Sequence, residues 1–131
     1  MGYAFALQRP VDGFADTVCG FNNDQMSYVR LIMLEASIID GNGFKAANRQ
    51  GLEVCEQTLP AARFVGVGGR VAAAEAAFIA QRLRQAVDRD LIDDLLSFLD
   101  DHPGESAVRG WVNEFIDLNE RAAMDDGYYI V

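Results

Sequence analysis

Hydrophobic residues recur with helical spacing over one long stretch, residues 71–101, whose character changes halfway along. Its alanine-rich first half carries an apolar stripe spaced i, i+3, i+4, i+7 and i+11, formed by Ala76, Ile79, Ala80, Leu83 and Val87. The second half carries a stripe formed by Ile92, Leu95, Leu96 and Leu99, flanked by Leu91 and Phe98. Because the two stripes are out of register, the pattern predicts a bend or break near residues 88–90.

The face opposite the second stripe consists almost entirely of aspartate: Asp90, Asp93, Asp94, Asp100 and Asp101. Like charges four residues apart on a helix, such as Asp90 and Asp94, cost roughly 0.2–0.5 kcal/mol per pair. Acidic residues near the C-terminus of a helix also oppose its macrodipole. We therefore interpret this row as serving either solubility or a partner, and both alternatives remain open.

The two ends of the chain carry strand patterns. Residues 2–9 are apolar on both alternating faces, residues 10–13 have the Pro and Gly of a turn, and residues 14–19 suit a returning strand. Residues 128–131 are expected to form a terminal strand. Its expected mate is the N-terminal hairpin, which would bring the termini together.

One helix is predicted between the hairpin and the central stretch. Asn22 followed by Gln25 has the spacing of a capping box, and the helix is expected to span about residues 24–37. Residues 44–70 show no clear period, and the glycines of residues 66–69 are expected to form a flexible connection into the central helix.

Pro103 and Gly104 are expected to end the aspartate-rich helix, and one further helix follows. Its predicted buried stripe is Val108, Trp111, Val112, Phe115, Leu118 and Ala122, and its outer face carries Glu114, Asp117 and Glu120. The whole pattern predicts a single α+β domain over residues 1–131, mostly helical with about four helices. A small antiparallel sheet would come from the N-terminal hairpin and the C-terminal strand.

Composition agrees with one soluble domain. The chain has 131 residues, half of them hydrophobic, and no apolar run near the roughly 18 residues of a membrane span. The N-terminus lacks the pattern of a secretory signal, so we expect a cytoplasmic protein with no membrane contact. Cys19 and Cys55 are expected to be free thiols. With His102 they give only three Cys or His residues, so neither a metal site nor a cofactor is expected.

Charge is unevenly distributed along the chain. Residues 1–87 contain eight acidic and eight basic side chains, whereas residues 88–131 contain twelve acidic and three basic ones. The entire net charge of −9 therefore lies in the last third. Such a surface repels phosphates, which argues against direct binding to nucleic acid, and it favours a basic protein partner.

Three local patterns suggest ligand or catalytic chemistry. Residues 66–69 resemble a dinucleotide-binding turn but lack its third glycine and the βαβ frame, so a loop is favoured. The aspartates from Asp88 onward lack the glycine and glutamate of a calcium-binding loop. His102 lies beside carboxylates and could act as a general base, although an exposed loop histidine is the commoner case.

Aromatic residues supply the last candidates, because Trp and Tyr dominate binding hot spots. Trp111 falls in the predicted buried stripe and is expected in the core. Neighbouring residues of a strand point to opposite faces, so one of Tyr128 and Tyr129 faces away from the core, and Tyr129 is the candidate contact.

The leading hypothesis is a small acidic inhibitor, a monomer or homodimer, that occludes a basic surface of a nuclease or nucleic-acid-binding complex. Toxin-neutralising immunity proteins and phage anti-CRISPR proteins share this profile of size and charge. The candidate contacts are Asp90, Asp93, Asp94, Asp100, Asp101, Glu114, Asp117, Glu120 and Tyr129. The alternatives are a non-catalytic adaptor or structural subunit with a merely solvated acidic face, and an enzyme with its site near His102.

Overall fold

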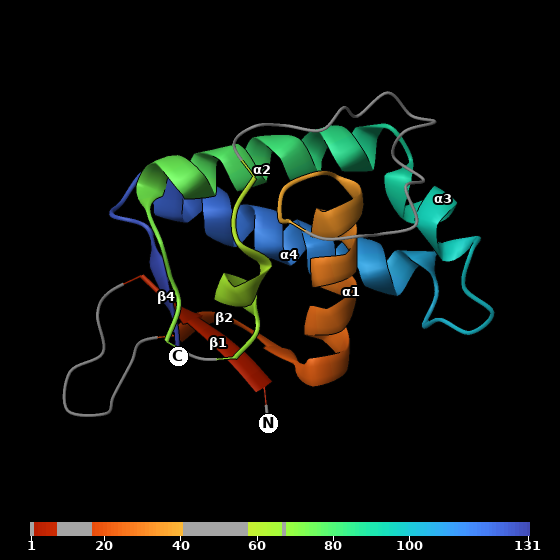
Figure 1. Cartoon of the computed structure of the whole chain (residues 1–131), viewed down its shortest axis with the longest axis horizontal. Coiled ribbons are helices and arrows are strands. Elements are labelled where there is room, and N and C mark those ends of the chain that lie inside the picture. The colour runs from red at the N-terminus through yellow and green to blue at the C-terminus, as the bar shows by residue number, and fades with distance from the viewer. Residues whose placement is uncertain (1, 8–16, 41–57, 67) are drawn as a thin grey trace.

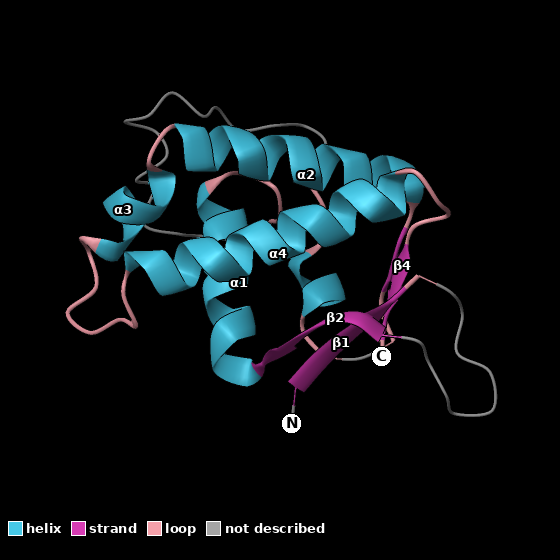
Figure 2. Cartoon of the chain, turned by 180° about the vertical axis from the view of Figure 1, so that it is seen from behind, coloured by secondary structure: helices cyan, strands magenta, loops and turns pink. Residues whose placement is uncertain are grey.

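Helices pack over a small twisted sheet in the computed structural model of the chain, which describes residues 2–7, 17–40, 58–66 and 68–131 (Figures 1 and 2). The described part is an α+β domain, as the sequence pattern predicts, with four helices and a four-stranded antiparallel sheet. Among the described residues, no helix is both long enough and apolar enough to cross a membrane.

The sheet joins the two ends of the chain. Its strand order is β2-β1-β4-β3, with β1 at Gly2–Ala6, β2 at Thr17–Asn22 and β4 at Tyr128–Ile130. Strand β1 pairs with both β2 and β4, which confirms the predicted hairpin and the pairing of the termini. Strand β2 begins and ends three residues later than predicted. The predicted turn at residues 10–13 lies outside the described residues.

The fourth strand, β3, spans Arg70–Val71 and was not predicted. It pairs with β4, and the chain before it extends the pairing, because the Ile130 N–H donates to the Gly69 carbonyl at 2.8 Å. The prediction of a flexible connection followed by a helix from residue 71 is therefore wrong here. A two-residue strand is too short to show a period, and its partner lies almost sixty residues further along.

Helix α1 spans Asn23–Glu35 and begins at the predicted capping box. The Gln25 N–H donates to the Asn22 side chain at 2.8 Å, and the Asn22 N–H donates to the Gln25 side chain at 2.9 Å. Both donations satisfy backbone N–H groups that a helix start leaves unpaired. A 3-10 turn, η2 at Ala61–Phe64, follows Pro60 in the region that shows no clear sequence period.

The central stretch is two helices, not one. Helix α2 spans Ala73–Asp88 and α3 spans Leu91–Leu96, with Asp90 between them in the left-handed conformation (φ 57°, ψ 30°). This confirms the predicted break. The prediction of a helix continuing to residue 101 is wrong. Beyond Ser97 the N–H groups of Phe98 and Leu99 donate to carbonyls three residues back, those of Leu95 and Leu96 at 3.0 Å each, and the chain leaves the α-helix there.

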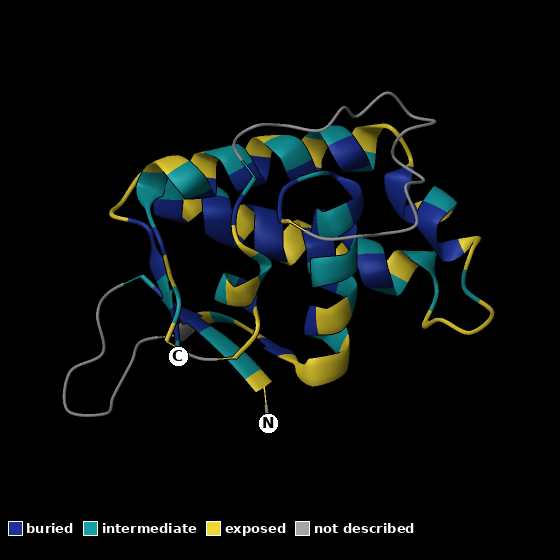
Figure 3. Cartoon of the chain, viewed as in Figure 1, coloured by how far each residue is buried: buried dark blue, intermediate teal, exposed yellow. Residues whose placement is uncertain are grey.

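Helix α4, Glu105–Ala123, crosses the molecule beside α2 and completes the layer over the sheet (Figure 2). The core lies between this layer and the sheet, where the buried segments of Figure 3 converge. Its centre is an aromatic cluster with edge-to-face contacts, formed by Phe5, Phe21, Phe64, Phe115 and Tyr128. Such pairs contribute about 0.5–1.5 kcal/mol each beyond the area they bury.

Three residues predicted to be buried lie at the edge of this core. Trp111 is only half-buried and packs its ring against Tyr28, with centroids 6.0 Å apart. Val87 and Leu99 are also half-buried, and Ala86 takes the inward position that the period assigned to Val87. The apolar stripes otherwise follow the sequence pattern.

Candidate functional site

The short helix α3 points its apolar side chains into the core and its acids outward. Leu91, Ile92, Leu95 and Leu96 are buried, Asp93 is exposed and Asp94 is half-buried. Both aspartates lie in the first turn of α3, where the partial positive charge of a helix N-terminus stabilises carboxylates. The expectation that this row opposes the macrodipole is therefore wrong for these two residues.

The other three aspartates of the row flank α3 rather than belonging to it. Asp90 precedes the helix, whereas Asp100 and Asp101 lie in the loop that leads to α4, and all three are exposed. Residues 88–101, which we call the α3 end, contain six aspartates and one arginine and carry a net charge of −5. The predicted helical row is thus divided between α3 and the segments beside it, and we call these acids at the α3 end of the molecule the acidic cap (Figure 1 shows the position of α3).

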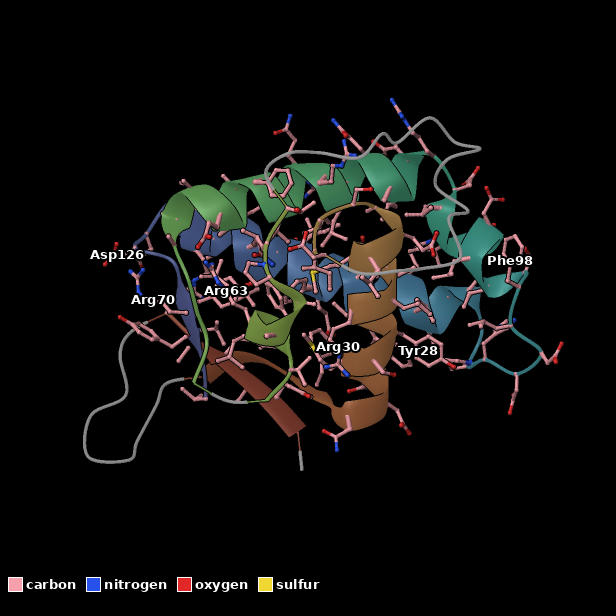
Figure 4. The ribbon with its side chains drawn as sticks, viewed as in Figure 1. Tyr28, Arg30, Arg63, Arg70, Phe98 and Asp126 are labelled. Carbon is pink, nitrogen blue, oxygen red and sulfur yellow. The ribbon has the colours of Figure 1, made fainter. Side chains whose placement is uncertain are left out.

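An exposed aromatic ring lies within this cap. Phe98 is 48% exposed and projects at the same end of the molecule as α3 (Figure 4). In the sequence pattern Phe98 only flanks a buried helical stripe, and the pattern does not predict that α3 ends at Leu96. Aromatic residues are enriched in protein interfaces, so Phe98 joins the neighbouring acids as a candidate contact residue.

Helix α4 presents a second, smaller acidic surface. Glu114 and Asp117 are exposed and line a groove of about 370 Å³ between α4 and the edge strand β2. The thiol of Cys19 also lines this groove. Burial, and secondly the charge of Glu114, raises the pKa of that thiol to about 11, so it is protonated at neutral pH. Cys19 is a free cysteine, and Cys55 lies outside the described residues.

Glu120, the third acid of the α4 row, is already engaged within the molecule. Its carboxylate accepts two hydrogen bonds from Arg84 of α2, at 3.0 Å from Nε and 2.5 Å from Nη2. The bond from Arg84 lowers the pKa of Glu120. This bidentate pair joins α2 to α4, so Glu120 is less available to a partner than Glu114 or Asp117.

Tyr129 lies far from the acidic cap. It is half-buried whereas Tyr128 is fully buried, which confirms that one of the pair faces away from the core. Its hydroxyl accepts from Arg70 Nε at 3.3 Å, and the guanidinium lies 5.5 Å from its ring centroid. Figure 4 shows Arg70 and Phe98 at opposite ends of the molecule. The structure therefore does not bring Tyr129 together with the α3 end.

His102 lines a second hollow, of about 580 Å³, between the start of α1 and the loop before α4. Its Nδ1 accepts from the Gly104 N–H at 3.1 Å. Ser27 shares the hollow, but its hydroxyl donates to the Asp24 carbonyl at 2.6 Å. If this hollow were an active site, His102 would be the candidate base and Ser27 the candidate nucleophile. Both side chains bond to backbone groups and not to each other.

Among the residues that the structure describes, no group of three or more His, Cys, Asp or Glu side chains is arranged to hold a metal ion. No protein-family model, curated protein or solved structure matches the chain.

Proposed function

We propose that this protein is a small acidic inhibitor that binds a basic surface of a nucleic-acid-handling protein through its α3 end. The observation that carries the proposal is the exposed Phe98 within a cap of net charge −5. The carboxylates of the cap would take the places of phosphates and accept charge-assisted hydrogen bonds from Arg and Lys. An immunity protein or a phage inhibitor of a host nuclease, acting in the cytoplasm, fits this mode of action.

The way α3 is held supports a preformed binding surface. Four of its six residues are buried, so the outward positions of Asp93 and Asp94 follow from core packing. A surface that is already ordered loses less conformational entropy on binding. A stable interface covers about 800 Å² on each partner. That is roughly a ninth of the 7006 Å² surface of this chain.

Charge placement also predicts how the complex forms. Exposed carboxylates on one end of the molecule steer a basic partner toward that end and raise the association rate. Salt screens this attraction over about 8 Å at physiological ionic strength. Phe98 would act later, because burial of an apolar side chain slows dissociation rather than steering the encounter.

Two matched charge reversals test the proposal. Asp93→Lys with Asp100→Lys changes the α3 end. Asp125→Lys with Asp126→Lys makes the same change in net charge on two adjacent exposed residues, and Figure 4 shows Asp126 at the opposite end of the molecule from Phe98. Each protein is used to capture partners from the source cells, and the captured protein is purified for affinity measurements. We expect the first pair to weaken binding at least about tenfold, because each like-charge contact costs several kcal/mol.

The second pair is the control, because Asp126 lies 3.5 Å from Arg70 on a mostly exposed surface and contributes little to folding. Both pairs should keep the wild-type circular dichroism spectrum. If the two pairs bind the purified partner equally well, the α3 end is only a solvated face. That result would favour the adaptor or structural subunit over an inhibitor.

A further inference from the structure

The hollow beside His102 combines aromatic rings with carboxylates. Tyr28 of α1 and Trp111 of α4 both line it, and their rings pack against each other with centroids 6.0 Å apart and planes inclined at 42°. Asp24, in the first turn of α1, and Asp101, from the α3 end, supply the acids. We refer to this hollow as the Tyr28–Trp111 pocket. In Figure 4, Tyr28 points toward the loop between α3 and α4.

We infer that the Tyr28–Trp111 pocket receives an arginine side chain of a basic partner. This inference rests on the proposed function, and it assigns a specific contact within that function. A guanidinium is planar and carries its donors in a fork, so it can lie against an aromatic ring while donating to carboxylates. Aromatic rings and two acids around a hollow of about 580 Å³ offer both kinds of contact.

The balance of charge in the pocket favours a cation. The N-terminus of α1 contributes a partial positive charge of about +0.5. Asp24 and Asp101 contribute two full negative charges, and both are exposed to an incoming ligand. The amides of Asn22 and Gln25, which also line the pocket, are already bonded to backbone N–H groups in the capping box. The two carboxylates therefore dominate the field that a ligand would meet.

Within the described residues, arginine lies over a tyrosine ring at two other positions. The Arg30 guanidinium lies 5.4 Å from the ring centroid of Tyr3, and Arg70 lies 5.5 Å from that of Tyr129. In the Tyr28–Trp111 pocket, two half-buried rings are available. An arginine side chain bound in this pocket would form the same arginine–aromatic contact that the fold already forms internally.

Trp111 gives a direct assay because it is the only tryptophan in the sequence. N-acetyl-arginine amide is titrated into the full-length protein while the emission of Trp111 is followed. N-acetyl-citrulline amide serves as the matched probe, because it has nearly the same shape without the charge. We expect a saturable change with the arginine probe and at least about tenfold weaker binding of the citrulline probe, which loses the ion pairs and the cation–π contact.

Three variants test whether the arginine probe binds in this pocket. Asp24→Asn and Asp101→Asn should each weaken the arginine probe about two- to fivefold, the range for a solvent-exposed ion pair. Asp125→Asn removes one exposed charge at the other end of the molecule and should leave the affinity unchanged. Circular dichroism checks that Asp24→Asn, at the start of α1, keeps the helix content of the wild type.

The inference is overturned if both probes bind equally, if neither binds, or if Asp24→Asn and Asp101→Asn leave the affinity for arginine unchanged. None of these results touches the proposed function, because the Asp93 and Asp100 reversals test the α3 end outside this pocket. Conversely, arginine binding that depends on Asp24 and Asp101 supports the pocket even if those reversals fail.

Discussion

The break between α2 and α3 gives a prediction that needs no partner. Asp90 adopts φ 57° and ψ 30°, in the left-handed region, and its side chain is exposed. Its N–H donates to the Val87 carbonyl at 3.2 Å, and its carbonyl accepts from the Asp94 N–H at 3.1 Å. The backbone on both sides is thus held, so a substitution at this position must keep the left-handed conformation or break these bonds.

The expected cost follows from backbone sterics. A left-handed conformation costs most L-residues roughly 1–2 kcal/mol, whereas Gly, and to a lesser degree Asn and Asp, tolerate it. Asp90→Val should therefore destabilise the fold by about 1–2 kcal/mol relative to Asp90→Gly. For a domain of 131 residues, each kcal/mol corresponds to a shift in Tm of about 3–4 °C.

Thermal denaturation followed by circular dichroism measures this difference. Asp90→Asn is the matched control, because it removes the charge and keeps the tolerance for the left-handed region, and its Tm should stay close to wild type. Since the side chain is exposed, loss of packing cannot explain a drop in the Val variant. Equal Tm values for the Val and Gly variants would show that Asp90 does not hold this conformation in solution.

Three further predictions concern the sheet, the thiol and the α2–α4 pair. Gly127→Ala should lower the free energy of unfolding by about 2 kcal/mol or more, because φ is 81° at this position and the added Cβ would lie 2.0 Å from the Val71 carbonyl oxygen. Denaturation measures this change, and an unchanged midpoint would contradict the β3–β4 geometry. Cys19, with a pKa of about 11, should react with iodoacetamide at pH 8 about a hundredfold more slowly than a model thiol. Peptide mass mapping separates it from Cys55, and a rate equal to the model thiol would refute its burial. Arg84 lowers the folded-state pKa of Glu120 below the unfolded-state value of about 4.3. The pair therefore stabilises the folded protein at pH values above the unfolded-state pKa, and this stabilisation is lost as the pH falls through the folded-state pKa. The Tm difference between wild type and Glu120→Gln should therefore shrink at pH 3, and the same difference at pH 3 and pH 7 would contradict the bond.

Local patterns in the sequence predicted the elements that local interactions determine. The capping box at Asn22 involves residues three positions apart, and the buried face of α4 follows one unbroken helical period. The break near Asp90 was visible as a change of register between two apolar stripes. In each case the signal and its physical cause lie within a few turns of the chain.

The features that the sequence did not reveal depend on distant or competing contacts. Strand β3 exists because β4 lies beside it, and two residues carry no period of their own. Helix α3 ends where the backbone hydrogen bonds change from four residues back to three residues back, although the periodic leucines continue to Leu99. The exposure of Phe98 follows from that helix end.

The residues that the structure brings together at the candidate site differ from the predicted set for the same reason. The acids at the α3 end remain together despite the shorter helix, because residues close in sequence stay close in space. Glu120 is paired with Arg84 from a helix more than thirty residues earlier, and Tyr129 lies at the other end of the molecule. The Tyr28–Trp111 pocket joins α1 to α4, so no local motif could have indicated it.

Competition between this protein and nucleic acid for the captured partner tests the central claim most directly. A fluorescent oligonucleotide bound to the purified partner is titrated with wild type and with the Asp93→Lys, Asp100→Lys pair, and its anisotropy is followed at two salt concentrations. We predict full displacement by the wild type, weaker displacement at high salt, and at least about tenfold less displacement by the pair. Simultaneous binding of wild-type protein and oligonucleotide to the same partner would contradict occlusion of a basic nucleic-acid-binding surface.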